Sequence, residues 1–217
     1  MMLNSDQLAY YQAQANVLYH ALYFEPSEFL LNQFRDNQVS DTWPTTGEAR
    51  SRGDALALLK PALSQDNATL VPALKRDYTR LFIGPGELAA IPWGSPYLHE
   101  KRLLCGPSTE ALAAFLQHHG ILVSTQSREP VDHIGLMLSV VAGLLGDEIK
   151  QQNGIALKVL SDFLEQHLLP WGLRFCTLMF EQASSDYYQA IALLTGSLLE
   201  GLRQDLTLTP LTLQLFQ

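Results

Sequence analysis

Residues 131–149, VDHIGLMLSVVAGLLGDEI, are the stretch that decides the fold of this 217-residue chain. Beyond its first turn, apolar side chains occupy almost every face that a helix would present. A helix that is hydrophobic all round is a buried helix, because no face of it suits water. Asn153-Gly154 is expected to end it. We therefore predict a central core helix against which the other helices pack.

The segments on either side repeat their apolar residues at intervals of three and four, which is typical of amphipathic helices. No series of alternating, strand-like segments interrupts them. The sequence therefore predicts an all-α fold, one globular bundle of about nine helices in a single domain, residues 1–217. The central helix is expected from Pro130, and the others over residues 5–24, 26–34, 48–63, 67–82, 107–120, 155–169, 171–179 and 187–202. Loops are expected over 37–47 and 84–106, a polar connection over 123–129, and a short extended piece in the tail LTLTPLTLQLFQ at 206–217.

Composition and charge exclude several kinds of partner. The chain is 47% hydrophobic and 17% charged, and its net charge of −8 argues against nucleic acid, because Lys and Arg supply most phosphate affinity. No window approaches the ~20 apolar residues of a membrane span, and the first residues lack a signal-peptide pattern. The cysteines, Cys105 and Cys176, form no CxxC pair. We expect a cytoplasmic protein without membrane insertion or nucleic-acid binding.

The loop at 84–106, GPGELAAIPWGSPYLHEKRLLCG, is unusually long for a compact domain. It contains three prolines, four glycines, Trp93 and Tyr97, and is too apolar for a disordered linker. A buried Trp93 that pins the loop to the core is one interpretation. The other is that proline and glycine hold aromatic rings at a rim, where a peptide can bind at low entropic cost. The sequence favours neither alone, and the two are compatible.

Signatures of catalysis are missing from the sequence. It has no phosphate-binding glycine loop, no HExxH and no GxSxG, and His99-Glu100 is only a dipeptide within the loop. Residues 129–133, EPVDH, are an ordinary helix start if Pro130 is the first helical residue and Asp132 complements the helix dipole. The same five residues would otherwise offer Asp132 and His133 as a functional pair.

At these motifs the sequence resembles the TorD/DmsD family of redox-enzyme maturation chaperones, and most closely the DmsD branch. The resemblance covers most of the chain. It is most specific in YTRLFIGPGELAAIPWGSPYLHEKRLLCGPSTEALAAFLQHHGI at 78–121, EPVDHIGLML at 129–138 and HLLPWGLRF at 167–175. It implies an all-helical chaperone without catalytic activity, metal or cofactor.

In that family the partner is the twin-arginine leader of a molybdenum-cofactor oxidoreductase of the dimethyl sulfoxide or trimethylamine N-oxide reductase type. The chaperone holds the precursor for cofactor insertion before Tat export. The resemblance also implies Tat translocon components as partners and a monomer or homodimer. Leader-binding residues carry over to Tyr23, Tyr78, Leu81, Phe82, Pro92, Trp93, Ser95, Tyr97, Gly106, Pro130, Asp132 and His133.

Within this set we expect Leu81, Phe82 and Trp93 to receive the apolar segment of the leader. Asp132 would contact an arginine, and His133 would orient Asp132 or donate to a leader carbonyl. Two departures from the family pattern bear on leader preference. Gly86 stands where the DmsD branch often has tryptophan, and Asn16 where arginine is frequent.

Two other classes of function remain open from the sequence. One is a small-molecule- or metal-dependent enzyme that uses the 84–106 loop as a lid over Asp132 and His133, with Glu100 nearby. The other is an assembly subunit that buries Trp93 against a copy of itself.

Overall fold

The computed structural model describes residues 3–46, 49–86, 88–123, 125 and 129–217, and the regular elements of this part of the chain are helical. The all-α prediction is confirmed, and nine of the helices have nine residues or more. Glu48, the expected start of one helix, lies outside the described residues, as do Gly47, Glu87 and most of the connection at 123–129. The helices are α1 (Ser5–Tyr23), α2 (Glu28–Asp36), α3 (Val39–Thr42), α4 (Ala49–Ser64), α5 (Asn67–Tyr78), α6 (Ser95–Leu98), α7 (Pro107–His118), α8 (Ile134–Gln151), α9 (Ile155–Phe163), α10 (Leu169–Gln182) and α11 (Asp186–Asp205).

The central helix begins later than the sequence indicated. We expected it from Pro130 with Asp132 in its first turn, and this is wrong, because α8 starts at Ile134. His133 is the N-cap in an extended conformation, and its Nδ1 accepts a hydrogen bond from Gly135 N at 3.1 Å. Pro130 and Asp132 therefore belong to a non-helical segment that leads into α8.

Two of the expected long helices change character before they end. The helix expected over 67–82 becomes a π turn at Thr79–Ile83, and the one expected over 155–169 becomes a π turn at Leu164–Leu168. Short helices also lie in segments expected to be loops: α3 within 37–47 and α6 within 84–106. Residues 208–217 contain neither helix nor strand.

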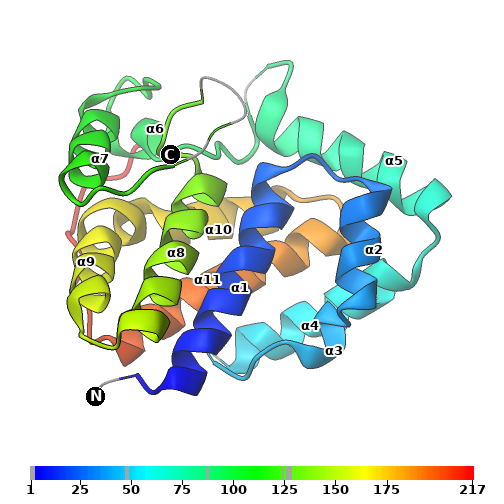
Figure 1. The fold of residues 1–217 in the computed structure, drawn as a ribbon. Coiled ribbons are helices and arrows are strands. Elements are labelled where there is room, and N and C mark those ends of the chain that lie inside the picture. The colour runs from blue at the N-terminus through cyan, green and yellow to red at the C-terminus, as the bar shows by residue number, and fades with distance from the viewer. Residues whose placement is uncertain (1–2, 47–48, 87, 124, 126–128) are drawn as a thin grey trace.

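The core is built around α8, as its apolar sequence predicted. In Figure 1, α1 runs beside α8 along its length, with α10 and α11 behind them. Gly135 permits the close approach at one end, since a Cβ there would lie 2.8 Å from the Cβ of Tyr23. None of the described helices is both long and apolar enough to cross a membrane.

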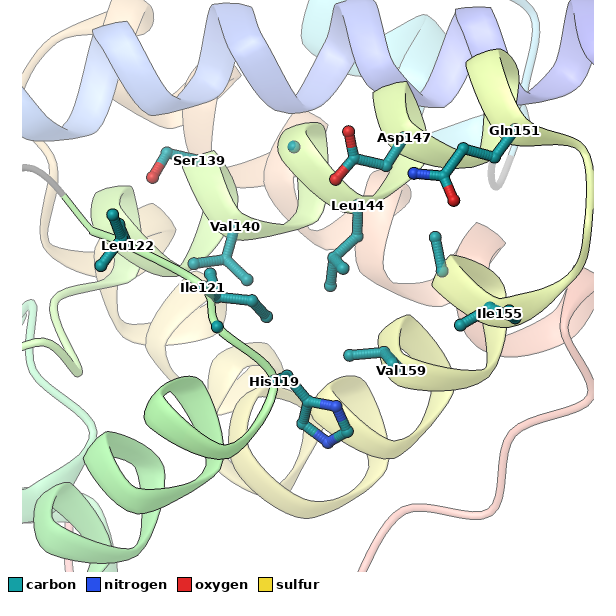
Figure 2. Close-up of a pocket in the computed structure, with 13 residues that line it drawn as sticks. His119, Ile121, Leu122, Ser139, Val140, Leu144, Asp147, Gln151, Ile155 and Val159 are labelled. Carbon is teal, nitrogen blue, oxygen red and sulfur yellow. The ribbon is translucent and has the colours of Figure 1, made fainter.

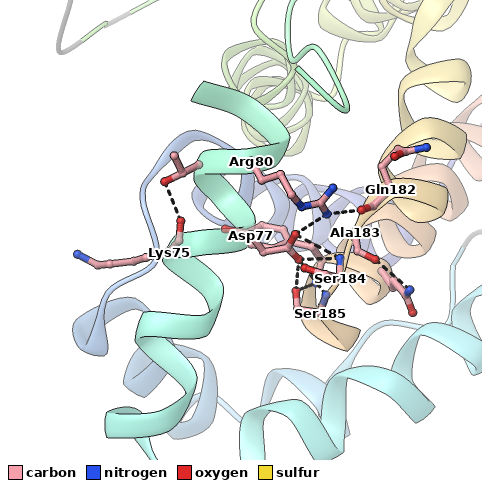
Figure 3. A network of polar contacts seen from close by, with 10 residues as sticks. Lys75, Asp77, Arg80, Gln182, Ala183, Ser184 and Ser185 are labelled. Atoms are coloured by element: carbon pink, nitrogen blue, oxygen red, sulfur yellow. Dashed lines mark hydrogen bonds and ion pairs between the residues drawn. The ribbon is translucent and has the colours of Figure 1, made fainter. Parts of the chain in front are cut away.

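A hydrogen-bond network joins the end of α5 to the turn between α10 and α11 (Figure 3). Asp77 is 2% exposed, and its carboxylate accepts from Ser184 N, Ser185 N and the Ser185 hydroxyl at 2.7–3.2 Å. Arg80 bonds the same carboxylate at 2.8 Å and also the carbonyl of Gln182. Burial raises the pKa of Asp77, but these hydrogen bonds outweigh it and hold the pKa below its ordinary value. The network fixes α5, and with it the start of the 84–106 loop, to the core.

Candidate peptide-binding site

The 84–106 loop pairs with the segment that leads into α8. Trp93 and His133 form an isolated antiparallel bridge. Gly94 N donates to the carbonyl of Asp132 at 3.1 Å, and Ile134 N donates to the carbonyl of Pro92 at 2.7 Å. Two sequence motifs that are about forty residues apart are therefore held side by side by backbone hydrogen bonds.

Aromatic side chains gather on one side of this bridge. The Trp93 and His133 rings are 5.5 Å apart, and the His133 and Tyr23 rings 5.4 Å apart, both edge to face. Tyr78 joins this cluster through its hydroxyl, which donates to the carbonyl of Tyr23 at 3.3 Å. Trp93 is half-buried, and its indole N–H is enclosed with no hydrogen-bond partner among the described residues. The cluster thus presents part of one indole ring on a well-packed base.

His133 does not orient the carboxylate of Asp132, which is one of the two roles expected for it. It caps α8 through Nδ1, and the carboxylate of Asp132 is held by other groups. Burial lowers the pKa of His133 to about 3, so the imidazole is neutral near pH 7. Its contribution to the site is to fix the start of α8 and to support Trp93.

Asp132 is a buried carboxylate that is only half satisfied. It is 4% exposed, and its Oδ2 accepts from Ser95 N at 2.7 Å and from the Thr109 hydroxyl at 3.1 Å. Its Oδ1 is buried without a partner in the described part of the chain, and so is the hydroxyl oxygen of Ser95. A buried acceptor left unpaired costs about 1–3 kcal/mol, and more when it is charged. The pair of oxygen atoms is therefore suited to a donor from outside the chain.

Asp132 and Ser95 line a cavity of about 280 Å³ beside the bridge. Most of its other walls are apolar, and they include Leu98, Leu112, Trp171, Leu211 and Leu213. His167 also lines it, and burial lowers the pKa of this imidazole. Trp93 is not one of the walls, so the aromatic cluster and the Asp132 cavity are neighbouring but separate parts of the site.

Three of the expected leader-binding residues lie in the core. Leu81 and Tyr97 are fully buried, and Phe82 is 3% exposed against Tyr78, Phe175 and Tyr188. The surfaces of Leu81 and Phe82 are covered by the chain itself in this structure, so these side chains could receive the leader only if they were uncovered. Tyr97 donates from its hydroxyl to the carbonyl of Ile91 at 2.9 Å, and burial raises its pKa. These side chains support the site from beneath.

The remaining expected residues are part of the backbone frame. Pro92 is buried and accepts from Ile134 N, while the carbonyl of Pro130 accepts from His133 N at 3.3 Å. Gly106 is the buried N-cap of α7, the helix that supplies Thr109.

Several site residues were missed by the analysis of the sequence. Thr109 binds Asp132, and Trp171, His167, Leu211 and Leu213 line the cavity. The segment 167–175 carried a signal, since we noted its HLLPWGLRF pattern without assigning it a role. The structure gives the reason for that pattern: a Cβ at Gly94 would lie 2.6 Å from the Trp171 indole, so the loop rests directly on that ring.

A second hollow, of about 420 Å³, lies between the end of α7, α8 and α9 (Figure 2). Figure 2 shows Val140, Leu144 and Val159 at its floor, with Asp147 and Gln151 along one rim. It shares no wall with the Asp132 cavity. Among the described residues, no three His, Cys, Asp or Glu side chains are grouped to hold a metal ion.

Comparison with known proteins agrees with this architecture. The family described as nitrate reductase delta subunit matches residues 47–177. A probable Tat proofreading chaperone DmsD from Haemophilus influenzae is 34% identical over 199 residues, which cover 90% of this chain and 91% of that protein. The Tat proofreading chaperone DmsD of Salmonella typhimurium is 29% identical, with 82% and 81% covered. The chaperone protein TorD of Shewanella pealeana is 28% identical, with 77% and 76% covered.

Fold and relatives together define an all-helical chaperone of redox-enzyme maturation rather than an enzyme. The chain belongs to the TorD/DmsD family. The alternative of an enzyme with a lid over Asp132 and His133 is therefore set aside.

Proposed function

We propose that this chaperone acts in the cytoplasm and binds the twin-arginine signal peptide of a molybdenum-cofactor oxidoreductase. The client is of the dimethyl sulfoxide or trimethylamine N-oxide reductase type, and it is held for cofactor insertion before Tat export. Membership of the TorD/DmsD family and the name Tat proofreading chaperone carried by two relatives support this function. Components of the Tat translocon are proposed as further partners.

The observation that carries the proposal is the buried Oδ1 of Asp132, which has no hydrogen-bond partner among the residues that the structure describes. A guanidinium group offers several N–H donors in one plane and stays charged inside a protein, so it matches a carboxylate that lacks a donor. Ser95 Oγ, which is likewise without a partner in the described part of the chain, can accept a second N–H. An arginine of the leader therefore fits the polar end of the cavity.

The apolar walls of the same cavity suit the segment that follows the two arginines. Burial of about 400 Å² of that segment contributes roughly 10 kcal/mol before the cost of ordering the peptide. A charge-assisted hydrogen bond adds only about 1.5–3 kcal/mol. Apolar contact thus supplies most of the affinity, while Asp132 selects arginine. In this proposal Leu98, Leu112 and Trp171 replace Leu81 and Phe82 as the receiving surface.

Calorimetric titration of the purified chain with a panel of twin-arginine leaders tests the function. Each leader is paired with a version in which both arginines are lysines. We expect at least one reductase leader to bind, and its twin-lysine version to bind about tenfold or more weakly, because lysine cannot make the planar contact. Absence of binding across the panel, or equal binding of each pair, would overturn the proposal.

A further inference from the structure

The last residues of the sequence lie across the candidate site. From the end of α11 this segment, residues 208–217, runs past α9 to α6 and α7 (red in Figure 1). Leu211 and Leu213 close one side of the Asp132 cavity. The same side chains remain 51% and 45% exposed, so they cover the cavity without being packed into the core.

Backbone hydrogen bonds hold this segment in place. Leu211 N donates to the carbonyl of Glu165 at 3.0 Å, and Thr209 N donates to the carboxylate of the same residue at 2.6 Å. Glu165 lies in the π turn Leu164–Leu168. Wide turns of this kind interrupt the regular helical ladder and are frequent at functional sites. Further along, Phe216 N donates to the carbonyl of Tyr97 at 3.0 Å.

The end of the segment is held by two arginines. Arg102 bonds the side-chain oxygen of Gln217 at 2.7 Å, and Arg174 Nε bonds its carbonyl oxygen at 3.0 Å. Arg102 is exposed. Leu208 and Leu215 pack against the hydrophobic core, whereas Leu211 and Leu213 between them remain exposed. A net hydrogen bond contributes only about 0.5–1.5 kcal/mol, so the part of the segment that the hydrogen bonds hold over the cavity can be displaced by a competing peptide.

We propose that residues 208–217 occupy, within the same chain, the surface that takes the apolar part of the signal peptide, and that the signal peptide displaces them. This inference rests on the function proposed above. The carbonyls of Glu165 and Tyr97 accept backbone N–H groups, so they bind an extended peptide whatever its side chains, as in strand addition. The leucines at 211 and 213 stand where apolar leader residues would lie over the cavity.

When residues 208–217 cover the cavity, the leader cannot bind there. The apparent Kd for the leader is therefore the intrinsic Kd divided by the fraction of molecules in which the cavity is uncovered. Replacing Leu211 and Phe216 by proline removes the two N–H groups that bind Glu165 and Tyr97. We expect each substitution to lower the Kd for a twin-arginine leader by about fivefold, the factor that corresponds to one net hydrogen bond. Thr212→Pro is the matched control, since Thr212 N has no partner among the described residues, and it should leave the Kd unchanged.

A second measurement uses the unaltered chain. Hydrogen exchange at the amides of Leu211 and Phe216 should be slow in the free protein and faster when the leader is saturating. If the leader binds but these amides stay protected, or if Leu211→Pro and Phe216→Pro bind it no better than Thr212→Pro, displacement is overturned while the proposed function stands. If neither the unaltered chain nor the proline variants bind any leader, both proposals fall.

Discussion

The imidazole of His133 supports the indole of Trp93 edge to face, with ring centroids 5.5 Å apart and ring planes at 80°. The two residues form a backbone bridge, so the position of the loop is tied to the start of α8. Because His133 also contacts Tyr23 on α1, the indole is supported, through His133, by the two central helices of the fold. The aromatic cluster around Trp93 is therefore held in place by the fold itself.

Trp93→Ala should lower the affinity for the leader more than tenfold and leave the protein folded. Replacing a large side chain by a small one in a core lowers the free energy of unfolding by about 3–5 kcal/mol. Because Trp93 is only half-buried, we expect Trp93→Ala to lower the free energy of unfolding by about 1–2 kcal/mol. Titration calorimetry and thermal unfolding measure the two effects. Trp93→Phe, which retains an aromatic ring, should bind the leader with an affinity between those of the unaltered protein and Trp93→Ala. Loss of the cooperative thermal transition in Trp93→Ala would show that this side chain serves mainly to hold the fold.

Asp132→Asn should weaken binding of a twin-arginine leader about 10- to 100-fold, the range expected for one charge-assisted hydrogen bond. The amide oxygen can still accept from Ser95 N and the Thr109 hydroxyl, so the melting temperature should change little. A twin-lysine leader should lose less affinity. The difference in affinity between the twin-arginine and the twin-lysine leader should therefore be smaller in Asp132→Asn than in the unaltered protein. Glu129→Gln, the same change of charge three residues away, controls for net charge. Equal losses for both leaders, or none, would contradict the assignment.

Two glycines of α8 should respond in opposite directions to alanine. Gly135→Ala places a Cβ 2.8 Å from Tyr23 Cβ and 3.1 Å from the backbone of α1, so it should destabilise the fold by about 1–3 kcal/mol. Gly143 has no such neighbour within 4 Å, and Gly143→Ala should stabilise by up to about 1 kcal/mol through helix propensity. Urea unfolding compares the variants. Similar free energies of unfolding for Gly135→Ala and Gly143→Ala would show that α1 and α8 separate easily.

Stability should fall in acid partly through Asp77. Its pKa in the folded state lies below the ordinary value of 3.8, so its contribution is fully present above that value. The contribution is lost as the pH falls through the lower, folded-state pKa. Asp77→Asn should cost about 2–3 kcal/mol at pH 7 and flatten this part of the stability profile. Ser185→Ala, which removes a helix cap and one of the bonds to Asp77, should cost about 1 kcal/mol and keep the acid dependence. Denaturant titrations from pH 2 to 7 measure both effects. If the pH dependence of the free energy of unfolding is the same in Asp77→Asn as in the unaltered protein, Asp77 does not contribute to the loss of stability in acid.

The helical class and the central helix could be predicted from the sequence because apolar periodicity is a local property. The start of α8 could not. Its preceding residues stay extended because Asp132 and Ile134 bond to the 84–106 loop, and a partner so far along the chain leaves no trace in the local pattern.

The candidate site was predictable only in part for a similar reason. Motifs indicated that the 84–106 loop and residues 130–133 act together, and the bridge between Trp93 and His133 brings them together. Aromatic or apolar character alone does not say whether a side chain faces solvent or the core, so the burial of Leu81, Phe82 and Tyr97 could not be predicted. The cavity walls from α10 and from residues 211 and 213 depend on tertiary packing, which brings together residues that are far apart in the sequence.

The contact between Gly135 and Tyr23 also has an evolutionary consequence. Residue 135 should remain glycine during evolution, because any larger side chain would require α1 and α8 to move apart. A single substitution rarely achieves such a movement. Eight residues further along the same helix, residue 143 is under no such restraint. Homologous proteins should therefore vary at position 143 while keeping glycine at position 135.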